Sequence, residues 1–491
     1  MNHIRRITVI ALIISLMNIS GCVVSTDEDM TLDNISPQSS VDEYVTSDNK
    51  SSQPPTDEYV TLDNVSSHPS ADEYVTSDNI SSQSPTDEDI TSANVSSQLP
   101  ANEYVTSANV SSQSPANEYV TSANVTSQSP ADENVPPPVD EYVPTEAGNM
   151  TTMEYVRSMG VGINLGNTFD CIGDWFDKTV KGQETAWGSP VITKNAIEGY
   201  ADGGFGVMRL PVSWTTLADK EGNIPDEFMD RIEEVVNWIL NSGMKCILNT
   251  HHDGWEKKFS ENYDEAMKLY EKIWTQIAQR FKNYDDNLMF ESMNEVGFDD
   301  IWNQYGGTEG KQEAFDIFNS INQKFVDLIR SSGGCNKKRH LLIAAYWTNS
   351  DHACDDMFIL PNDPAGRLAV SVHYYGPSTL CILTEDADWG KARTDWGSDE
   401  DYKELYGNFD KMKEHFTDKN IPIIIGEYGC FGNNKTREVR EQWMLDVAAA
   451  SCERQMCPIL WDTKGDEFDR EKAEFRNPDF IKKIVSLADE T

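Results

Sequence analysis

The sequence predicts an α/β protein whose folded part is a parallel (β/α)8 barrel, preceded by a long repetitive linker. Three observations predict the barrel. Eight short apolar runs alternate with stretches of amphipathic helical periodicity. The runs are continuously apolar, as expected for strands buried on both faces, which favours a closed parallel barrel over an open sheet. A segment of roughly 340 residues also suits one large α/β domain better than a sandwich.

The expected strands and helices follow one another along the chain. Each apolar run precedes a helical stretch, except the fifth, which precedes a looser connection. The runs are GVGINLGN, VMRLPVSW, KCILNTHH, NLMFESMNE, HLLIAAYW, LAVSVHYYG, PIIIGEYG and PILWDTKG. The helices are expected near residue 195 and at 226–242, 262–282, 311–331, 400–418, 436–454 and 478–488.

Residues 1–22 have the layout of an export signal. They join Arg5 and Arg6 to an apolar run that is too short for a permanent transmembrane helix. The last four residues, Ile-Ser-Gly-Cys, resemble the lipobox of bacterial lipoproteins, in which the cysteine, here Cys22, is lipidated. We expect an exported protein, either a cell-surface lipoprotein of the outer membrane or a free secreted protein cleaved near Gly21. Any membrane contact would then pass through Cys22.

Residues 23–149 are built from a repeated unit of fifteen residues, such as DEYVTSDNKSSQPPT from Asp42 and DEYVTLDNVSSHPSA from Asp57. Each unit has one or two apolar residues among Ser, Thr, Asp, Asn and Pro, too few to offset the entropy of ordering it. We therefore expect a disordered acidic tether rather than a solenoid. The chain has a net charge of −42, and both the tether and the remainder are acidic, which argues against a nucleic-acid partner.

Polar residues gather at the expected carboxyl ends of the strands, where such barrels bind their substrates. Glu427 closes the apolar run PIIIG, and Asn294 and Glu295 close the fourth run. Two carboxylates facing each other across a barrel mouth suit cleavage of a glycosidic bond. At the ends of other strands stand Arg209, His251, His252, His373, Tyr375 and Trp461.

Tryptophans provide a second indication of a sugar ligand, because flat aromatic rings can stack on the C–H faces of sugars. For each tryptophan, packing in the core is the alternative. Those in or near expected upper loops are Trp175, Trp187, Trp214, Trp255, Trp347, Trp389 and Trp461.

Eight motifs taken together resemble glycoside hydrolase family 5. In chain order they are GINLGNTFD, ETAWG, VMRLPVSW, ILNTHHDGW, MNEV, VHYYG, GEYG and LWD. The segments GNTFD and ETAWG are similar to subfamily 4. The resemblance covers essentially the whole stretch from about residue 155 to 487, within the expected catalytic domain of residues 150–491. It implies a (β/α)8 barrel, retaining hydrolysis of internal bonds in β-1,4-linked glucans of the cellulose or mixed-linkage type, and no metal or organic cofactor.

Position by position, the resemblance makes Glu295 the acid/base and Glu427 the nucleophile. Retention needs the two carboxyl groups about 5 to 5.5 Å apart, whereas inversion needs a wider gap. Glu427 must be ionised, and Arg209 and Tyr375 match the residues that hold it in that state. Glu295 must begin protonated, which calls for a pKa raised by partial burial and by the charge of Glu427.

The resemblance also assigns residues around the sugar at the point of cleavage. Asn294 matches the contact to the sugar 2-hydroxyl, His251 and His373 match hydrogen-bonding histidines, and Trp461 matches the platform beneath the sugar. Choosing His251 over His252 depends on strand register, because neighbouring side chains of a strand point to opposite faces. Residues in the subfamily-like motifs are expected to border the cleft or to close a loop: Asn167, Glu184 and Trp187.

Several alternatives compete with this interpretation. One is a metal site formed by the segment THHD with His373, but adjacent histidines of a strand cannot both face inward without a bulge. Another is that Arg209 is a structural ion-pair partner. A third is the same chemistry on xyloglucan, xylan or mannan. A non-catalytic surface glycan-binding lipoprotein is the alternative from another class. Our expectation is a monomeric enzyme with a β-glucan substrate.

Overall fold

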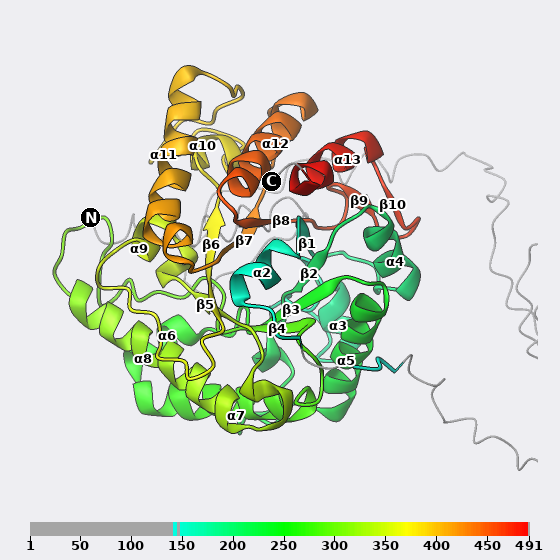
Figure 1. Cartoon of the computed structure of the whole chain (residues 1–491), viewed down its shortest axis with the longest axis vertical. Coiled ribbons are helices and arrows are strands. Elements are labelled where there is room, and N and C mark those ends of the chain that lie inside the picture. The colour runs from blue at the N-terminus through cyan, green and yellow to red at the C-terminus, as the bar shows by residue number, and fades with distance from the viewer. Residues whose placement is uncertain (1–140, 145–147, 490–491) are drawn as a thin grey trace, which may run out of the picture. The chain divides into compact units, whose positions relative to one another are not determined.

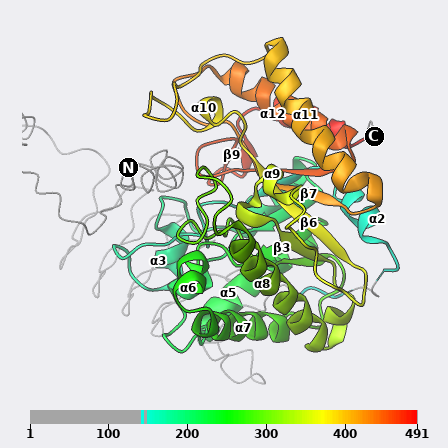
Figure 2. The same ribbon diagram turned by 90° about the vertical axis from the view of Figure 1, so that its left-hand side faces the viewer.

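The computed structural model describes residues 141–144 and 148–489. The predicted export signal, Cys22 and most of the predicted linker lie outside these residues. Eight parallel strands close into a barrel in chain order, and helices surround it (Figure 1 and Figure 2). This is the predicted fold class. Within the described residues, no helix is long and apolar enough to cross a membrane.

The barrel strands fall within the predicted apolar runs, except that β8 begins one residue before its run. They are β1 (Gly162–Asn164), β2 (Val207–Leu210), β3 (Lys245–Asn249), β4 (Leu288–Glu291), β5 (Leu341–Ala344), β6 (Leu368–Tyr374), β7 (Ile423–Tyr428) and β8 (Cys457–Leu460). A hairpin of β9 (Phe468–Asp469) and β10 (Glu474–Phe475) follows β8.

The main helices also lie where periodicity predicts them. They are α4 (Lys194–Asp202), α5 (Asp226–Asn241), α7 (Tyr263–Arg280), α8 (Lys311–Ser331), α11 (Asp399–His415), α12 (Arg437–Glu453) and α13 (Pro478–Ser486). Shorter helices are α2 (Thr152–Arg157), α3 (Val180–Thr185), α6 (Trp255–Glu261), α9 (Ser350–Ala353) and α10 (Ser378–Cys381). The short α9 corresponds to the looser connection predicted after the fifth strand.

Side chains inside the barrel form an apolar layer below a polar one. The apolar layer packs against α2 and contains Val207, Ile247, Met289, Leu342, Ala369, Ile424, Cys457 and Ile459. Two residues further along four of these strands stand fully buried polar residues: Arg209, Asn249, Glu291 and Ser371. Every second side chain of a strand faces the same side, so these residues also face the interior. The polar layer therefore lies directly beneath the mouth of the barrel.

Helix α2 covers the lower end of the barrel, and it lies in front of the strands in Figure 1. A capping box of Thr151 and Glu154 begins the helix by satisfying backbone N–H groups at its first turn. Tyr155 of α2 stacks on His340, with ring centroids 4.1 Å apart. His340 Nδ1 also lies 3.1 Å from the Thr152 hydroxyl. These contacts fix α2 against the bottom of the strands.

A buried arginine side chain, Arg339, also lies at this lower end of the barrel. Arg339, just before β5, is fully buried, and its N–H groups donate to oxygens 2.6 to 3.0 Å away. The acceptors are the Asn336 side-chain carbonyl and the backbone carbonyls of Phe281, Tyr284, Asp285 and Leu288. Its guanidinium also lies 4.6 Å from the ring centroid of Phe290. Arg339 therefore ties the turn before β4 to the start of β5.

The chain contacts the barrel earlier than the predicted domain boundary at residue 150. The Tyr142 hydroxyl donates to Asp285 Oδ2 at 2.7 Å and accepts from Asn287 Nδ2 at 3.1 Å. Its ring stacks on Tyr284, with centroids 5.9 Å apart. Tyr142 falls inside the segment predicted as linker, which therefore includes at least one residue that packs on the barrel.

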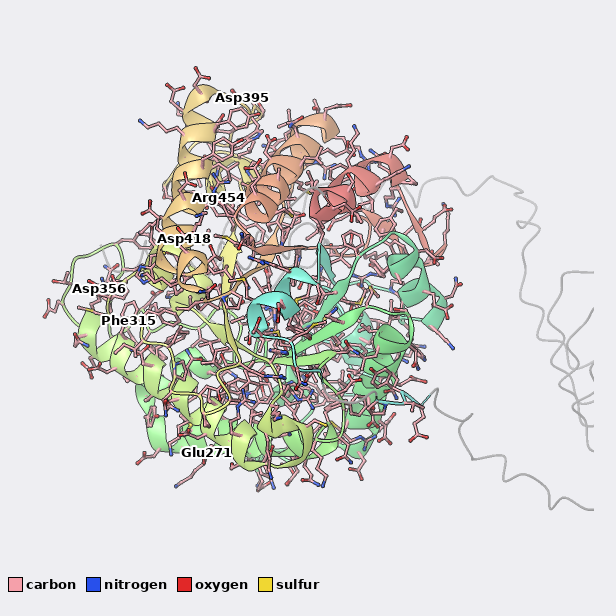
Figure 3. All side chains as sticks on the ribbon, viewed as in Figure 1. Glu271, Phe315, Asp356, Asp395, Asp418 and Arg454 are labelled. Atoms are coloured by element: carbon pink, nitrogen blue, oxygen red, sulfur yellow. The ribbon has the colours of Figure 1, made fainter. Side chains whose placement is uncertain are left out.

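Acidic side chains project outward from the helices and loops around the barrel (Figure 3). Three labelled carboxylates, Asp356, Asp395 and Asp418, are exposed, whereas the labelled Phe315 is buried in the core. This distribution agrees with the acidic composition of the chain.

Candidate active site

Arg209 lies at the centre of the polar layer and joins three other parts of the barrel wall. Its Nε donates to Glu291 Oε2 at 2.7 Å, and its Nη1 donates to Glu427 Oε1 at 2.8 Å. The same guanidinium donates to the side-chain oxygens of Asn164 and Asn294 at 3.1 and 2.9 Å. Burial alone would lower the pKa of Arg209, but the two carboxylates outweigh burial and raise it.

Glu427 faces the interior because β7 is irregular. Ile424 belongs to the interior apolar layer, so regular alternation would turn residue 427 outward, toward the helices. The register between β6 and β7 shifts just before Glu427, which pairs with His373. The shift leaves Gly426 as the extra residue of a bulge, and a Cβ on it would lie 2.9 Å from Ser371 Oγ. A glycine before Glu427 therefore allows the carboxylate to turn inward.

Both oxygens of Glu427 have donors. Arg209 donates to Oε1, and the Tyr375 hydroxyl donates to Oε2 at 2.9 Å. His373 Nδ1 lies 2.8 Å from Glu295 Oε1 and 3.6 Å from Glu427 Oε2. The carboxylate oxygens of Glu295 and Glu427 and the His373 ring nitrogen all lie within 4.8 Å of one another. The predicted pair of glutamates therefore does meet, and one oxygen of each lies closer to the other than the spacing of inverting glycosidases.

The pKa shifts of this pair have directions that differ from the prediction in the ligand-free protein. Burial is the largest single influence and raises the pKa of Glu295, but the hydrogen bond and charge of His373, together with the charges of His252 and Arg209, lower it overall. Burial raises the pKa of Glu427, partly offset by His373 and Arg209. The prediction of a raised pKa for Glu295 is thus wrong for the free protein, because it did not anticipate the contact with His373.

His251 and His252 both lie at the site. The prediction that only one can face it assumed that both belong to a strand, but β3 ends at Asn249. The His251 ring stacks on Trp461 at 6.0 Å, and the His252 ring lies 4.3 Å from His251. Burial lowers the pKa of both histidines, to about 4 for His252, where Glu295 partly opposes it. Both are therefore neutral at pH 7.

Trp461, directly after β8, packs its ring over the backbone of Gly166. A Cβ on that glycine would lie 2.7 Å from the ring. The indole is 6% exposed and faces His251 on one side. Next to Gly166, Asn167 adopts a left-handed backbone with φ 53°, and its N–H donates to Asp170 Oδ2 at 2.9 Å. Asn167 is buried and borders the same loop.

The side chains of Glu184 and Trp187 bond to neighbouring segments of the chain. Glu184 is buried, accepts from the Ile192 N–H at 2.6 Å and pairs with Arg231 at 2.8 Å. The Trp187 indole is 3% exposed and donates to the Ile172 carbonyl at 3.2 Å. Trp187 also lies 6.0 Å from His252. It packs beside this histidine, and substrate binding by Trp187 stays a prediction.

The other predicted tryptophan platforms divide into two groups. Trp214 and Trp255 are fully buried, so packing in the core explains them. Trp175 and Trp389 are 50% and 40% exposed. Trp347, directly after β5, is partly buried and has a left-handed backbone conformation. Its backbone N–H donates to the carbonyl of Val296, the residue after Glu295. Trp175, Trp347 and Trp389 remain available to a ligand.

The sequence interpretation missed Glu291. Besides Arg209, it accepts from Asn249 Nδ2 at 3.1 Å and from Ser371 Oγ at 2.7 Å, and it is fully buried. A carboxylate inside the apolar run NLMFE is the same signal that identified Glu427 in PIIIGE. The interpretation read only strand ends and therefore overlooked a residue inside the strand.

The metal-site alternative does not gather its predicted ligands. Among the described residues, the group close enough to share an ion is Glu295, His373 and Glu427. Asp253 instead accepts from the Thr215 N–H at 2.7 Å. The segment THHD therefore serves the loop after β3.

Comparison with known families identifies the barrel. The cellulase family of glycosyl hydrolases, glycosyl hydrolase family 5, matches residues 170–467, which include Arg209, Glu295 and Glu427. The chain belongs to glycosyl hydrolase family 5. This family 5 protein is therefore a glycoside hydrolase.

Individual relatives agree with this membership. Endoglucanase B of Clostridium cellulovorans is 35% identical over 321 residues, which are 64% of this chain and 68% of the relative. The xyloglucan-specific endo-β-1,4-glucanase of Bacteroides ovatus is 32% identical over 374 residues, 71% of this chain and 73% of the relative. The structure of a GH5-4 broad-specificity endoglucanase from an uncultured bovine rumen ciliate has a TM-score of 0.64 and 35% identity. It covers 70% of this family 5 chain and 99% of its own.

Proposed function

We propose that Glu427 is the nucleophile and Glu295 the acid/base of a retaining endo-β-1,4-glucanase that cleaves internal bonds of β-glucans. The observation that carries the two roles is the short gap, with carboxylate oxygens of both residues within 4.8 Å. Such a gap leaves no room for an attacking water between carboxylate and sugar, so the carboxylate itself attacks.

In the first step, an oxygen of Glu427 forms a bond to the anomeric carbon as the bond to the leaving oxygen breaks. Glu295 gives its proton to that oxygen. Arg209 and Tyr375 hold the two oxygens of Glu427 in place by hydrogen bonds of 2.8 and 2.9 Å. In the second step, Glu295 takes a proton from water, which attacks the anomeric carbon and releases Glu427.

The two carboxyls lie close enough to interact, so a bound ligand changes how readily each of them holds a proton. Glu295 has a side chain that is 22% exposed, whereas that of Glu427 is 4% exposed. A bound sugar covers Glu295 and removes its water, which favours the protonated form. Glu427 keeps its donors from Arg209 and Tyr375, so its charge stays compensated. Substrate binding thus reverses the order of the two pKa values found in the free protein.

Asn294 and the aromatic residues bind the sugar chain. Asn294 Oδ1 accepts from Arg209, which leaves its amide N–H groups for the sugar 2-hydroxyl. Trp461 lies beneath the sugar at the point of cleavage, with His251 beside it. The exposed Trp175 and Trp389 offer further stacking surfaces.

We place soluble and branched glucans first among the substrates, with mixed-linkage β-glucan as the main one. A specific observation favours xyloglucan as a second substrate, because the Bacteroides ovatus relative that acts on it matches 71% of this chain. The GH5-4 relative of broad specificity supports the same choice.

We also propose that the enzyme is exported as a monomer and held at the cell surface by a lipid on Cys22. The support is the lipobox-like Ile-Ser-Gly-Cys after the apolar run. Cells given a radioactive fatty acid should label the protein, and Cys22→Ser should abolish the label and release the enzyme to the medium. Equal labelling of both proteins would refute the anchor.

The catalytic roles are tested by two variants. Glu427→Gln should lose about four orders of magnitude in kcat on mixed-linkage β-glucan without change in melting temperature. Glu295→Ala should lose as much on β-glucan but far less on a 2,4-dinitrophenyl β-cellobioside, whose leaving group needs no proton. NMR of the first product should show the β-anomer. A glycan-binding protein without activity, or an α-anomer, would refute the proposal.

A further inference from the structure

The described end of the tether contains a tripeptide that recurs along it. Glu141-Tyr142-Val143 is the last of a series of Glu-Tyr-Val copies in the tether. The earlier copies lie outside the described residues, at 43–45, 58–60, 73–75, 103–105 and 118–120. Another Glu-Tyr-Val, at 154–156, belongs to α2, and its tyrosine is buried beneath the strands. Only the copy with Tyr142 shows how a tether tyrosine contacts the barrel.

Tyr142 occupies a site that we call the tyrosine seat, formed by Tyr284, Asp285 and Asn287. Its hydroxyl uses both hydrogen-bonding capacities there, as donor to Asp285 and as acceptor from Asn287. Its ring stacks on Tyr284 with an interplanar angle of 17°. Val143 is 79% exposed. The seat therefore recognises the tyrosine side chain rather than the residue that follows it.

The seat is held together without Tyr142. The Tyr284 hydroxyl is bonded to Glu233 and Asn237 at 3.0 and 2.7 Å. Asp285 Oδ1 accepts from the Asn287 N–H at 3.0 Å, and Arg339 donates to the carbonyls of Tyr284 and Asp285. Because these contacts lie within the barrel, an empty seat should keep its shape for another tyrosine.

We propose that the tyrosine seat is a docking site for the repeats of this chain, in which the tyrosine of an upstream copy can replace Tyr142. Every upstream copy offers the same phenol between the same two neighbours. A flexible linker supplies an effective concentration of about 1 mM or more, which suffices for a weak contact. One stacked ring and two hydrogen bonds are consistent with a dissociation constant on the order of 1 mM.

The tyrosine seat lies at the end of the barrel away from the two glutamates. It immediately precedes β4, at the amino-terminal end of the barrel, opposite the end that holds Glu295 and Glu427. Whichever copy docks, the tether leaves from the face away from the substrate. The length of chain between the docked tyrosine and Cys22 then changes from copy to copy, mostly in steps of fifteen residues.

The first test uses a barrel without repeats, residues 138–491 with Tyr142→Ala. Such a barrel should fold, because the solved rumen ciliate enzyme aligns with only 70% of this chain. The probe is a peptide of residues 57–64, DEYVTLDN, titrated into the labelled protein by NMR. The controls are the same peptide with Tyr59→Ala and a peptide of residues 87–94, DEDITSAN, a natural unit with Asp89 at the tyrosine position.

We expect saturable changes in the NMR chemical shifts of residues 284–287 when the tyrosine peptide is added, and none with either control peptide. Asn287→Ala in the same protein should weaken binding about fivefold, the value of one hydrogen bond, without changing the melting temperature. Equal binding of all three peptides, or no binding up to 10 times the expected constant of about 1 mM, would overturn the proposal.

The second test asks whether the repeats of the same chain use the seat. The full chain from residue 23 with Tyr142→Ala should bind the tyrosine peptide several-fold more weakly than the barrel without repeats, because its own copies compete. Equal affinities would overturn the proposal. Sedimentation should give the mass of one chain, and a dimer lost on removing the repeats would overturn the intramolecular form. Neither test depends on catalysis.

Discussion

Two arginines are equally buried at opposite ends of this barrel and have opposite kinds of partner. Arg209, beneath the mouth, is bonded to two carboxylates and two amide side chains. Arg339, at the lower end, is bonded to one amide oxygen and four backbone carbonyls. Carboxylates raise the pKa of Arg209, whereas burial lowers that of Arg339 to about 10.

The difference shows that the partners of a buried charge reveal its role better than its burial does. Arg339 uses neutral oxygens of the turn before β4, so it stabilises the fold. In the proposed mechanism Arg209 holds the carboxylate that must carry charge during the reaction, so we assign Arg209 to the chemistry. The following predictions test this division, from the largest expected effect to the smallest.

Arg209→Lys should lower kcat/KM on β-glucan by about 10³-fold, or ~4 kcal/mol, because an ammonium cannot reproduce the planar fork that reaches four oxygens. Thermal melting should change little by comparison, since the positive charge is kept. Kinetics and melting of the same preparation measure both. Unchanged kcat/KM would show that Arg209 is the structural ion-pair partner that the sequence left open.

Arg339→Lys is the matched control, and it should lower stability while leaving turnover nearly unchanged. It should destabilise the protein by about 3 kcal/mol, because several buried backbone carbonyls lose their donor. The kcat of the folded fraction should stay within about twofold, given the distance of Arg339 from the chemistry. Urea unfolding measures the loss. A variant that melts normally but fails to turn over would contradict the division.

His340 should make the lower end sensitive to acid. Burial, with Arg367, Arg330 and Arg339 nearby, lowers its pKa from 6.5 to about 3. The folded protein therefore binds fewer protons than the unfolded chain, so its stability is full above pH 6.5 and falls as the pH drops toward 3. Between pH 6.5 and 4.5 this costs about 2 kcal/mol.

His340→Phe removes the titrating group and keeps a ring to stack on Tyr155. Between pH 6.5 and 4.5, the free energy of unfolding of the variant should fall by about 2 kcal/mol less than that of the parent protein. Urea unfolding at pH 6.5 and at pH 4.5 measures both values. Parallel losses in the two proteins would show that His340 does not control acid stability.

Glu291→Gln should have the smallest effect, about tenfold in kcat or ~1.4 kcal/mol. The variant leaves Glu427 as the one carboxylate bonded to Arg209, so the pKa of Glu427 should fall and it should become a weaker nucleophile. The acidic limb of the pH profile should move to lower pH. Ser371→Ala removes another contact of Glu291 without changing charge and should leave the limb in place. A reduced kcat with an unmoved limb would assign Glu291 a purely structural role.

Much of the fold follows from pattern alone. Continuously apolar runs separated by amphipathic helices are the repeating unit of this barrel. Seven of the eight strands lie inside the predicted runs, and β8 begins one residue before its run. Strand ends then locate Arg209, Asn294, Glu295, His373, Tyr375 and Glu427, which the structure brings together.

What escaped prediction depends on local departures from regular strands. Glu427 faces inward only because of the bulge at Gly426, and His251 and His252 share the site because β3 ends early. The pKa of Glu295 depends on an ångström-scale contact with His373 from another strand. Glu291 was within reach, since counting in steps of two from the apolar Met289 places it in the interior.

The guanidinium of Arg209 also acts as a strut across the mouth of the barrel. It connects β2 to β1, β4 and β7, so the wall cannot widen there without breaking bonds to carboxylates. Arg209 thereby fixes Glu427 on β7 and also holds Asn294, the neighbour of Glu295 in the segment after β4. Loops can then be exchanged to admit a different polysaccharide while the stereochemistry of cleavage stays the same.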